Sequence, residues 1–126
     1  MITVYLVDDQ ASARTGLRLR LGLEPDLVVI GEASDAEYAL VEIADLRPAV
    51  IVMDVAMPGM DGIMATEQLQ TSVPGVGVVM LSLYDDADTR DRSFAAGANA
   101  FVSKQDSDDA LLVAIRAAGK GPEVRE

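Results

Sequence analysis

The sequence contains neither cysteine nor histidine. Without cysteine the chain can form no disulfide framework and no thiolate metal site, which is compatible with the reducing cytoplasm where we expect it to act. Without histidine it can neither perform Ser-His-Asp or Cys-His catalysis nor hold a histidine-ligated zinc. Any phosphohistidine in its chemistry must therefore come from another protein.

Long apolar runs and an excess of positive charge are also missing. The first apolar run, Ile2–Val7, follows no basic segment and ends at Asp8 and Asp9, so we predict neither a signal peptide nor a membrane span there. The net charge of -11 disfavours sequence-independent binding to nucleic-acid phosphates or to an anionic membrane. We therefore expect no direct contact of this chain with DNA or with a membrane.

The rest of the composition, half apolar over 126 residues, predicts one folded domain without internal repeats. Short apolar runs predict strands at residues 2–7, 27–30, 50–53, 76–81 and 100–102. Helices are expected at about residues 11–21 and after the capping positions Asp35, Asp61, Asp85-Asp86 and Ser107 or a neighbouring aspartate. This alternation predicts an α/β fold, (βα)5, with a doubly wound five-stranded parallel sheet and five helices.

Arginines dominate the polar positions of the first predicted helix. Leu17 and Leu21 lie four residues apart and are expected to face the core. Arg14, Arg18 and Arg20 are expected elsewhere on the helix surface.

Three carboxylates follow two of the predicted strands. Asp8 and Asp9 come directly after the first strand, and Asp54 comes directly after the third. Ligands of an open parallel sheet bind beyond the carboxyl ends of its strands, so these acids can converge on one point. Adjacent negative charges repel each other and need a cation, and an all-oxygen cluster suits a hard one such as Mg2+. The sequence therefore predicts metal-assisted phosphate chemistry.

Two further polar residues complete a recognisable pattern. Ser82 follows the fourth strand and Lys104 the fifth, and Asp54 lies within the segment Met53–Gly62. Taken in this order, the pattern resembles the receiver domain of two-component response regulators over nearly the whole chain. The segments Ala96–Ala98, Phe101–Lys104 and Ala114–Ala117 resemble the NarL/FixJ-like (LuxR-type) branch of that family.

The resemblance implies a flavodoxin-like strand order, 2-1-3-4-5, as in chemotaxis receivers. It also implies domain limits. We expect the receiver to span residues 1–121, residues 122–126 to be a tail or the start of a linker, and no effector domain to lie within this chain.

The resemblance further implies a role for each acid. Asp54 would be the phosphoacceptor, forming an aspartyl phosphate. Asp9 and Asp54 would bind Mg2+ (or Mn2+) directly together with the backbone carbonyl of Ala56, and Asp8 would act through a bound water. Lys104 would place a positive charge opposite the metal.

Ser82 and Phe101 would form the switch of such a domain. Ser82 would donate a hydrogen bond to a phosphoryl oxygen and move toward the phosphoryl group, and Phe101 would swing inward behind it. The partner surface formed by the fourth helix, fifth strand and fifth helix would then change.

The partners implied by the resemblance are a sensor histidine kinase and, on phosphorylation, a second copy of the chain. Control of transcription would pass through a helix-turn-helix DNA-binding domain that these residues do not include. The chain would assist its own phosphorylation and slow dephosphorylation without being a turnover enzyme.

Two other functions fit part of the pattern. A Mg2+-dependent phosphatase of the dehalogenase-like class also forms an aspartyl intermediate, but it uses Asp-x-Asp, and the stretch Asp54-Val55-Ala56 lacks the second acid. A degenerate receiver that acts only as an interaction module is disfavoured because the acids, Ser82 and Lys104 are all present.

Overall fold

Strands and helices alternate along the chain, as the apolar pattern predicts. The computed structural model describes residues 1–120, so the predicted boundary at residue 121 and the tail 122–126 lie outside the described residues. The elements are β1 (Ile2–Val7), α1 (Ala11–Leu21), β2 (Leu27–Ala33), α2 (Ala36–Leu46), β3 (Val50–Asp54), α3 (Gly62–Ser72), β4 (Gly77–Ser82), α4 (Ala87–Ala95), β5 (Ala100–Ser103) and α5 (Asp108–Ala118).

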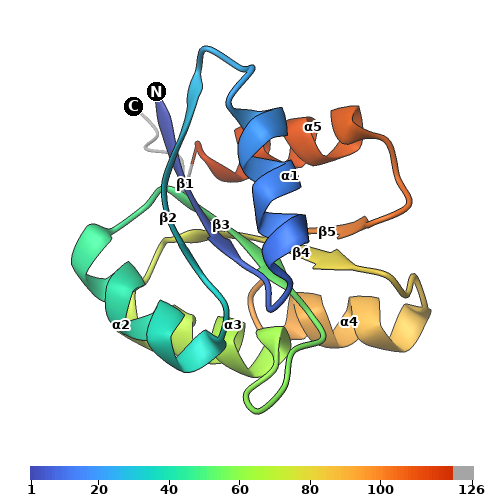
Figure 1. Ribbon diagram of the computed structural model, residues 1–126. Helices are drawn as coiled ribbons and strands as arrows, with labels where there is room; N and C mark the ends of the chain where they lie inside the picture. Colours follow the sequence, from blue (N-terminus) through green and yellow to red (C-terminus); the bar gives the residue numbers. More distant parts are fainter. Residues whose placement is uncertain (121–126) are drawn as a thin grey trace, which may run out of the picture.

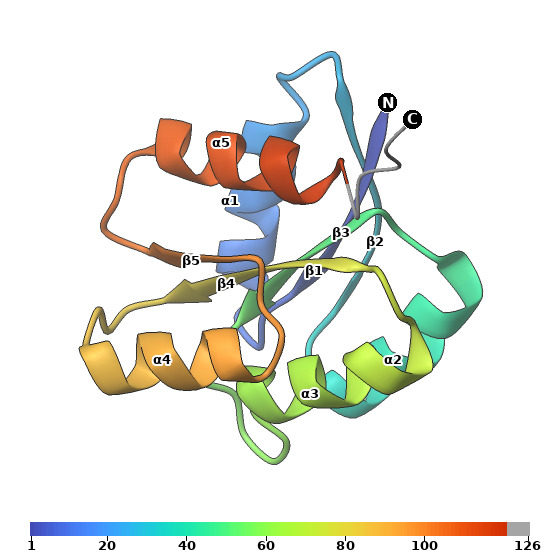
Figure 2. The ribbon, with the colours of Figure 1, turned by 180° about the vertical axis from the view of Figure 1, so that it is seen from behind.

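The five strands form one parallel sheet in the order β2-β1-β3-β4-β5, which confirms the predicted topology. Helices α1 and α5 cover one face of the sheet, and α2, α3 and α4 cover the other (Figures 1 and 2). The chain moves outward from β1 to β2 and then returns past β1 to β3. The carboxyl ends of β1 and β3 therefore flank the switch point where ligands bind in such sheets.

Alternate side chains of each strand pack into two separate hydrophobic clusters, one on each face of the sheet. On β1, Tyr5 belongs to the cluster under α2 and α3, whereas its neighbour Leu6 belongs to the cluster under α1 and α5. Both side chains are fully buried. Coverage of both faces explains why these strands appear in the sequence as unbroken apolar runs. The central strands are thus packed from both sides.

Side-chain caps begin four of the five helices. The capping oxygens of Asp35, Asp61, Asp86 and Ser107 each accept the backbone N–H three residues ahead. Asp61 is therefore the predicted helix cap and is not one of the converging acids. No helix within residues 1–120 has the length and apolar character needed to cross a bilayer.

Strand β2 continues three residues past its predicted end at Ile30. The added residues, Gly31, Glu32 and Ala33, pair with β1 at the edge of the sheet. A Cβ on Gly31 would lie 2.7 Å from the buried Tyr5 ring, so a larger residue at this edge position would have to displace that ring. The prediction was short because small and polar residues at a sheet edge break the apolar run before the strand itself ends.

The loop after β3 returns very close to the strand it leaves. The Gly62 N–H donates to the Val55 carbonyl at 2.9 Å. A Cβ on Gly62 would lie only 2.1 Å from the Asp54 carbonyl oxygen. The first residue of α3 is therefore packed directly against the backbone of Asp54.

Replacing Gly62 with Ala should lower the free energy of unfolding by about 2–3 kcal/mol, because the added methyl group must displace backbone atoms. Gly16→Ala is a suitable control, since no atom lies within 4 Å of a Cβ at that helical position. It should stabilise the domain by about 0.5–1 kcal/mol. Urea unfolding measures both values, and equal effects of the two substitutions would contradict the close approach.

Candidate functional site

Four charged side chains converge at the carboxyl edge of the sheet. Asp8 and Asp9 follow β1, Asp54 ends β3, and Lys104 follows β5. One carboxylate oxygen from each of the three aspartates lies within 4.8 Å of the others. The Lys104 Nζ lies 3.3 Å from Asp8 Oδ2 and 3.3 Å from Asp54 Oδ1. These four residues of the sequence prediction are therefore brought together.

Asp8 is held by four neighbours. Its side chain is only 2% exposed, and Oδ1 accepts the Gln10 N–H at 2.9 Å while Oδ2 accepts a hydrogen bond from Lys104. The Asp8 backbone N–H donates to the Ala33 carbonyl at 3.1 Å. Arg14 donates to the Asp8 carbonyl oxygen at 2.7 Å. This buried carboxylate is fixed in position before any cation binds.

Burial raises the pKa of Asp54 to about 6, with repulsion from Asp8 as the second cause and attraction by Lys104 opposing both. Burial of Lys104 disfavours its charged form, but the Asp54 and Asp8 carboxylates outweigh this and raise its pKa. Near neutral pH, Asp54 is therefore mainly a carboxylate and Lys104 an ammonium group. Asp54 thus has the ionisation state that a nucleophile needs.

A cavity of about 190 Å³ opens beside these charges. It is lined by Asp9, Gln10, Asp54, Ala56, Leu83, Tyr84 and Lys104. Its lining offers the carboxylates of Asp9 and Asp54 as metal ligands, and Ala56 lies on its wall, where its backbone carbonyl could add another oxygen. Such a set fits a hard divalent cation such as Mg2+ or Mn2+, held by Asp9 and Asp54 with Asp8 nearby.

Ser82 does not reach Asp54 in this structure. Its hydroxyl donates to the Tyr84 carbonyl at 2.9 Å and accepts the Tyr84 N–H at 3.0 Å, so it holds the loop between β4 and α4. The Lys104 N–H in turn donates to the Ser82 carbonyl at 2.7 Å. The two residues are thus adjacent through their backbones while only Lys104 extends its side chain to the acids.

Phe101 lies inside the core. Its side chain belongs to the cluster under α2 and α3, and the Arg90 guanidinium carbon lies 5.0 Å from the ring centroid. Arg90 is itself tethered to Asp85 at 3.0 Å. The inward ring position that the resemblance links to phosphorylation is therefore already occupied, while the Ser82 hydroxyl remains with its own loop.

Arg14 is a site residue to which the sequence analysis gave no role. It was expected on the surface of α1, where its side chain is 15% exposed and reaches back to the Asp8 carbonyl. A helical pattern places a side chain on one face without revealing that a long guanidinium can reach the preceding loop. Gln10, which donates to Asp8, was also missed, although its position directly after the two aspartates was a usable signal.

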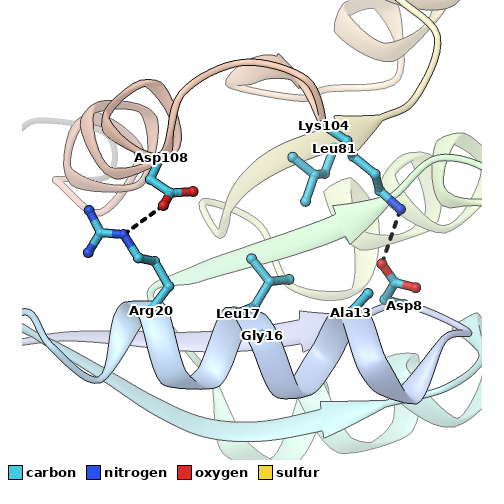
Figure 3. A pocket seen from close by; sticks show the side chains of 8 residues that line it. All are labelled: Asp8, Ala13, Gly16, Leu17, Arg20, Leu81, Lys104 and Asp108. Carbon is cyan, nitrogen blue, oxygen red and sulfur yellow. Dashed lines mark hydrogen bonds and ion pairs between the residues drawn. The ribbon is translucent and has the colours of Figure 1, made fainter.

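A second cavity, of about 370 Å³, lies between α1 and α5. Figure 3 shows the Asp8–Lys104 pair near one end and the Arg20–Asp108 pair near the other, with Leu17 and Leu81 between them. Asp8 and Lys104 are therefore shared between the groove and the acid cluster.

Comparison with known proteins gives one consistent family. Residues 4–116 match the family described as the response regulator receiver domain. The chain is 40% identical over 121 residues to the transcriptional regulatory protein LiaR of Bacillus subtilis strain 168, covering 96% of this chain and 57% of that protein. It thus spans little more than half of this relative.

Two solved structures are similar to most of the chain. A LuxR-family two-component response regulator from Aurantimonas sp. SI85-9A1 has a TM-score of 0.91 and 28% identity over 94% of this chain and 85% of that one. The signal receiver domain of the putative response regulator NarL from Mycobacterium tuberculosis has a TM-score of 0.88 and 28% identity, over 94% and 96% of the two chains.

The raised pKa of Asp54 predicts a specific pH dependence of stability without divalent metal. Because the folded pKa of about 6 lies above the ordinary value of 3.8, the folded state holds this proton more tightly. The stability of the metal-free domain should fall as pH rises from about 4 to 6, and then level off for this group. Asp54→Asn should therefore stabilise the metal-free domain by about 3 kcal/mol at pH 7 and by little near pH 4.

Urea unfolding in EDTA at several pH values measures this difference. Asp61→Asn is the control, because Asp61 caps α3 and is not part of the acid cluster. A stabilisation by Asp54→Asn that does not change between pH 4 and 7 would show that carboxylate burial is not its cause.

Proposed function

Because the chain belongs to the response regulator receiver family, in its NarL/FixJ-like branch, we propose that Asp54 accepts a phosphoryl group from a sensor histidine kinase. The observation that supports this role most directly is the position of Asp54 at the end of β3, beside the carboxylates of Asp8 and Asp9 and 3.3 Å from Lys104 Nζ. Receivers of this family are generally not turnover enzymes, and the proposed reaction leaves the protein itself modified.

The proposed transfer is a single displacement at phosphorus. A carboxylate oxygen of Asp54 forms the new bond to phosphorus, and the bond from phosphorus to the phosphohistidine nitrogen of the kinase breaks. The electron pair stays on that imidazole nitrogen, and the kinase histidine leaves as neutral imidazole because its other ring nitrogen carries the proton. The kinase must supply the histidine because this chain has none.

The other charged residues would reduce the charge repulsion that opposes this reaction. A carboxylate nucleophile and a phosphoryl group repel each other, and Mg2+ or Mn2+ bound by Asp9, Asp54 and the Ala56 carbonyl, with Asp8 acting through a water, would neutralise the transferred charge. Lys104, which is paired with Asp54, would exchange that carboxylate for a phosphoryl oxygen.

Ser82 and Phe101 are proposed to read out the modification. Ser82 would leave its two hydrogen bonds with Tyr84 and donate to a phosphoryl oxygen. This exchange would change the loop that precedes α4, whose Arg90 lies over Phe101. The phosphoryl group would thereby alter the surface of α4, β5 and α5 that a partner contacts.

The output is proposed to be control of transcription. The relative LiaR is named a transcriptional regulatory protein, and this chain covers 57% of it. We propose that a helix-turn-helix domain outside this sequence binds DNA and that phosphorylation promotes pairing of two copies. The cytoplasmic location remains a prediction. The phosphatase alternative gains no support, because Ala56 stands where that class needs a second acid.

Incubation with Mg2+ and acetyl phosphate should add one phosphoryl group, detected by intact mass. Acetate is then the leaving group, so no kinase is required. The adduct should disappear in Asp54→Asn and in EDTA, and it should persist in Asp61→Asn, which changes a nearby aspartate outside the cluster. An unmodified wild-type protein that is folded and binds Mg2+ would instead favour a degenerate receiver or strict dependence on a kinase.

Phe101→Leu should leave the yield of the phosphoryl adduct nearly unchanged but weaken the conformational response to it. The reason is that Phe101 does not line the cavity beside the acid cluster but is packed beneath α4 through Arg90. The response is measured as amide chemical-shift changes in α4 and β5 on phosphorylation. Phe94→Leu, at the other phenylalanine, is the control because that side chain is 43% exposed. A full response in Phe101→Leu would remove Phe101 from the switch.

A further inference from the structure

Arg14 connects three elements around the acid cluster. It extends from α1, and its guanidinium donates to the Asp8 carbonyl oxygen at 2.7 Å and to Glu32 Oε2 on β2 at 3.1 Å. The side chain is 15% exposed, so water competes little for these bonds. Arg14 therefore joins the loop after β1 to the edge strand β2.

The carbonyl that Arg14 binds belongs to the peptide bond between Asp8 and Asp9. That peptide is planar, so fixing its oxygen also fixes the direction in which the Asp9 residue leaves the plane. The Asp9 side chain is exposed, and its carboxylate accepts no hydrogen bond from residues 1–120. Its backbone is consequently what orients it, whereas the Asp8 carboxylate has Gln10 and Lys104 to hold it.

Glu32 helps to hold Arg14 in this position, and it has a second arginine partner of its own. Glu32 Oε1 also accepts from Arg18 at 2.6 Å, and Arg18 has no contact with Asp8 among its ion pairs and hydrogen bonds within residues 1–120. Both arginines lower the pKa of Glu32, with the hydrogen bond from Arg18 as the larger cause, so Glu32 is ionised at neutral pH. Removing Arg14 would leave Glu32 paired with Arg18 and would release only the Asp8–Asp9 peptide.

We propose that Arg14 is a positioning residue for the divalent-cation site: by holding the peptide between Asp8 and Asp9, it orients the Asp9 carboxylate toward Asp54. This inference rests on the proposed function, since it assumes that Asp9 and Asp54 share a cation. Groups that orient metal ligands typically change metal affinity about 10–100-fold when they are removed. Arg14 binds the backbone next to the ligand Asp9 and not the ligand itself, so we expect a change in Mg2+ affinity at the lower end of this range.

Mg2+ titration followed by calorimetry tests the proposal. Arg14→Ala should weaken Mg2+ binding about tenfold. The matched control, Arg18→Ala, removes the other arginine bound to Glu32 and should change the affinity less than about twofold. Wild-type affinity in Arg14→Ala would overturn the proposal, and so would equal weakening in both variants, because the shared Glu32 pair would then be responsible.

Arg14→Lys provides a second variant that keeps the charge and most of the packed stem. Lysine lacks the planar guanidinium that can donate to Glu32 and to the Asp8 carbonyl at the same time. The Mg2+ affinity of Arg14→Lys should therefore fall between those of the wild type and Arg14→Ala. Thermal unfolding in EDTA identifies any variant that does not fold. If Arg14→Ala fails to fold, Arg14→Lys decides: undiminished Mg2+ affinity would overturn the proposal.

Phosphorylation by acetyl phosphate distinguishes positioning from general damage. In Arg14→Ala, the Mg2+ concentration for half-maximal rate should rise about tenfold, while the rate at saturating Mg2+ should return near that of the wild type. A lowered saturating rate with unchanged Mg2+ dependence would overturn the positioning role. Failure of the wild type itself to bind Mg2+ would reject the proposed function instead, so the two failures are distinguishable.

Discussion

Repulsion between buried carboxylates is the constraint on which this molecule depends. Asp8 and Asp54 are 2% and 6% exposed, and Asp9 brings a third carboxylate oxygen within 4.8 Å of theirs. Lys104 is the only cation among the described residues that forms ion pairs with this cluster. One ammonium group cannot neutralise three carboxylates, so the site retains negative charge that a divalent cation can balance. Burial and, second to it, repulsion from Asp8 both raise the pKa of Asp54.

The doubly wound sheet makes such an arrangement sustainable. A lone exposed loop would relax and separate the like charges, whereas here the acids follow β1 and β3, two neighbouring central strands packed on both faces. Two contacts restrict the adjoining loops. Gly62 packs closely against Asp54, and Arg14 donates a hydrogen bond to the Asp8 carbonyl. The packed core therefore keeps the three carboxylates close together despite their mutual repulsion.

Much of this arrangement could be predicted from the sequence because it depends on periodicity and on position along the chain. Apolar runs predict the strands, capping residues such as Asp35 and Asp61 predict helix starts, and the convergence of Asp8, Asp9, Asp54 and Lys104 follows from the shared carboxyl edge. The predicted strand order is also correct. These features depend on backbone geometry, which local sequence constrains strongly.

The sequence did not predict how far a long side chain reaches or which of several possible hydrogen bonds a side chain forms. Arg14 fits a solvent-facing helical position equally well on pattern alone, and only the tertiary structure reveals its bond to Asp8. The engagement of the Ser82 hydroxyl by Tyr84 is likewise a choice between rotamers that residue identity does not encode. The end of β2 was missed because Gly31 and Glu32 interrupt the apolar run, and the pairs that Glu32 forms with Arg14 and Arg18 are visible only in the tertiary structure.

The division of the core by the sheet has an evolutionary consequence. Adjacent residues on one strand, such as Tyr5 and Leu6, pack against different helix layers, so a substitution beneath α1 and α5 leaves the packing beneath α2 and α3 largely untouched. The two outer surfaces can therefore diverge at different rates while the acid cluster between them stays constant. A gene duplicate of such a domain could acquire a new binding specificity on one surface and inherit the old one on the other, without rebuilding its chemistry.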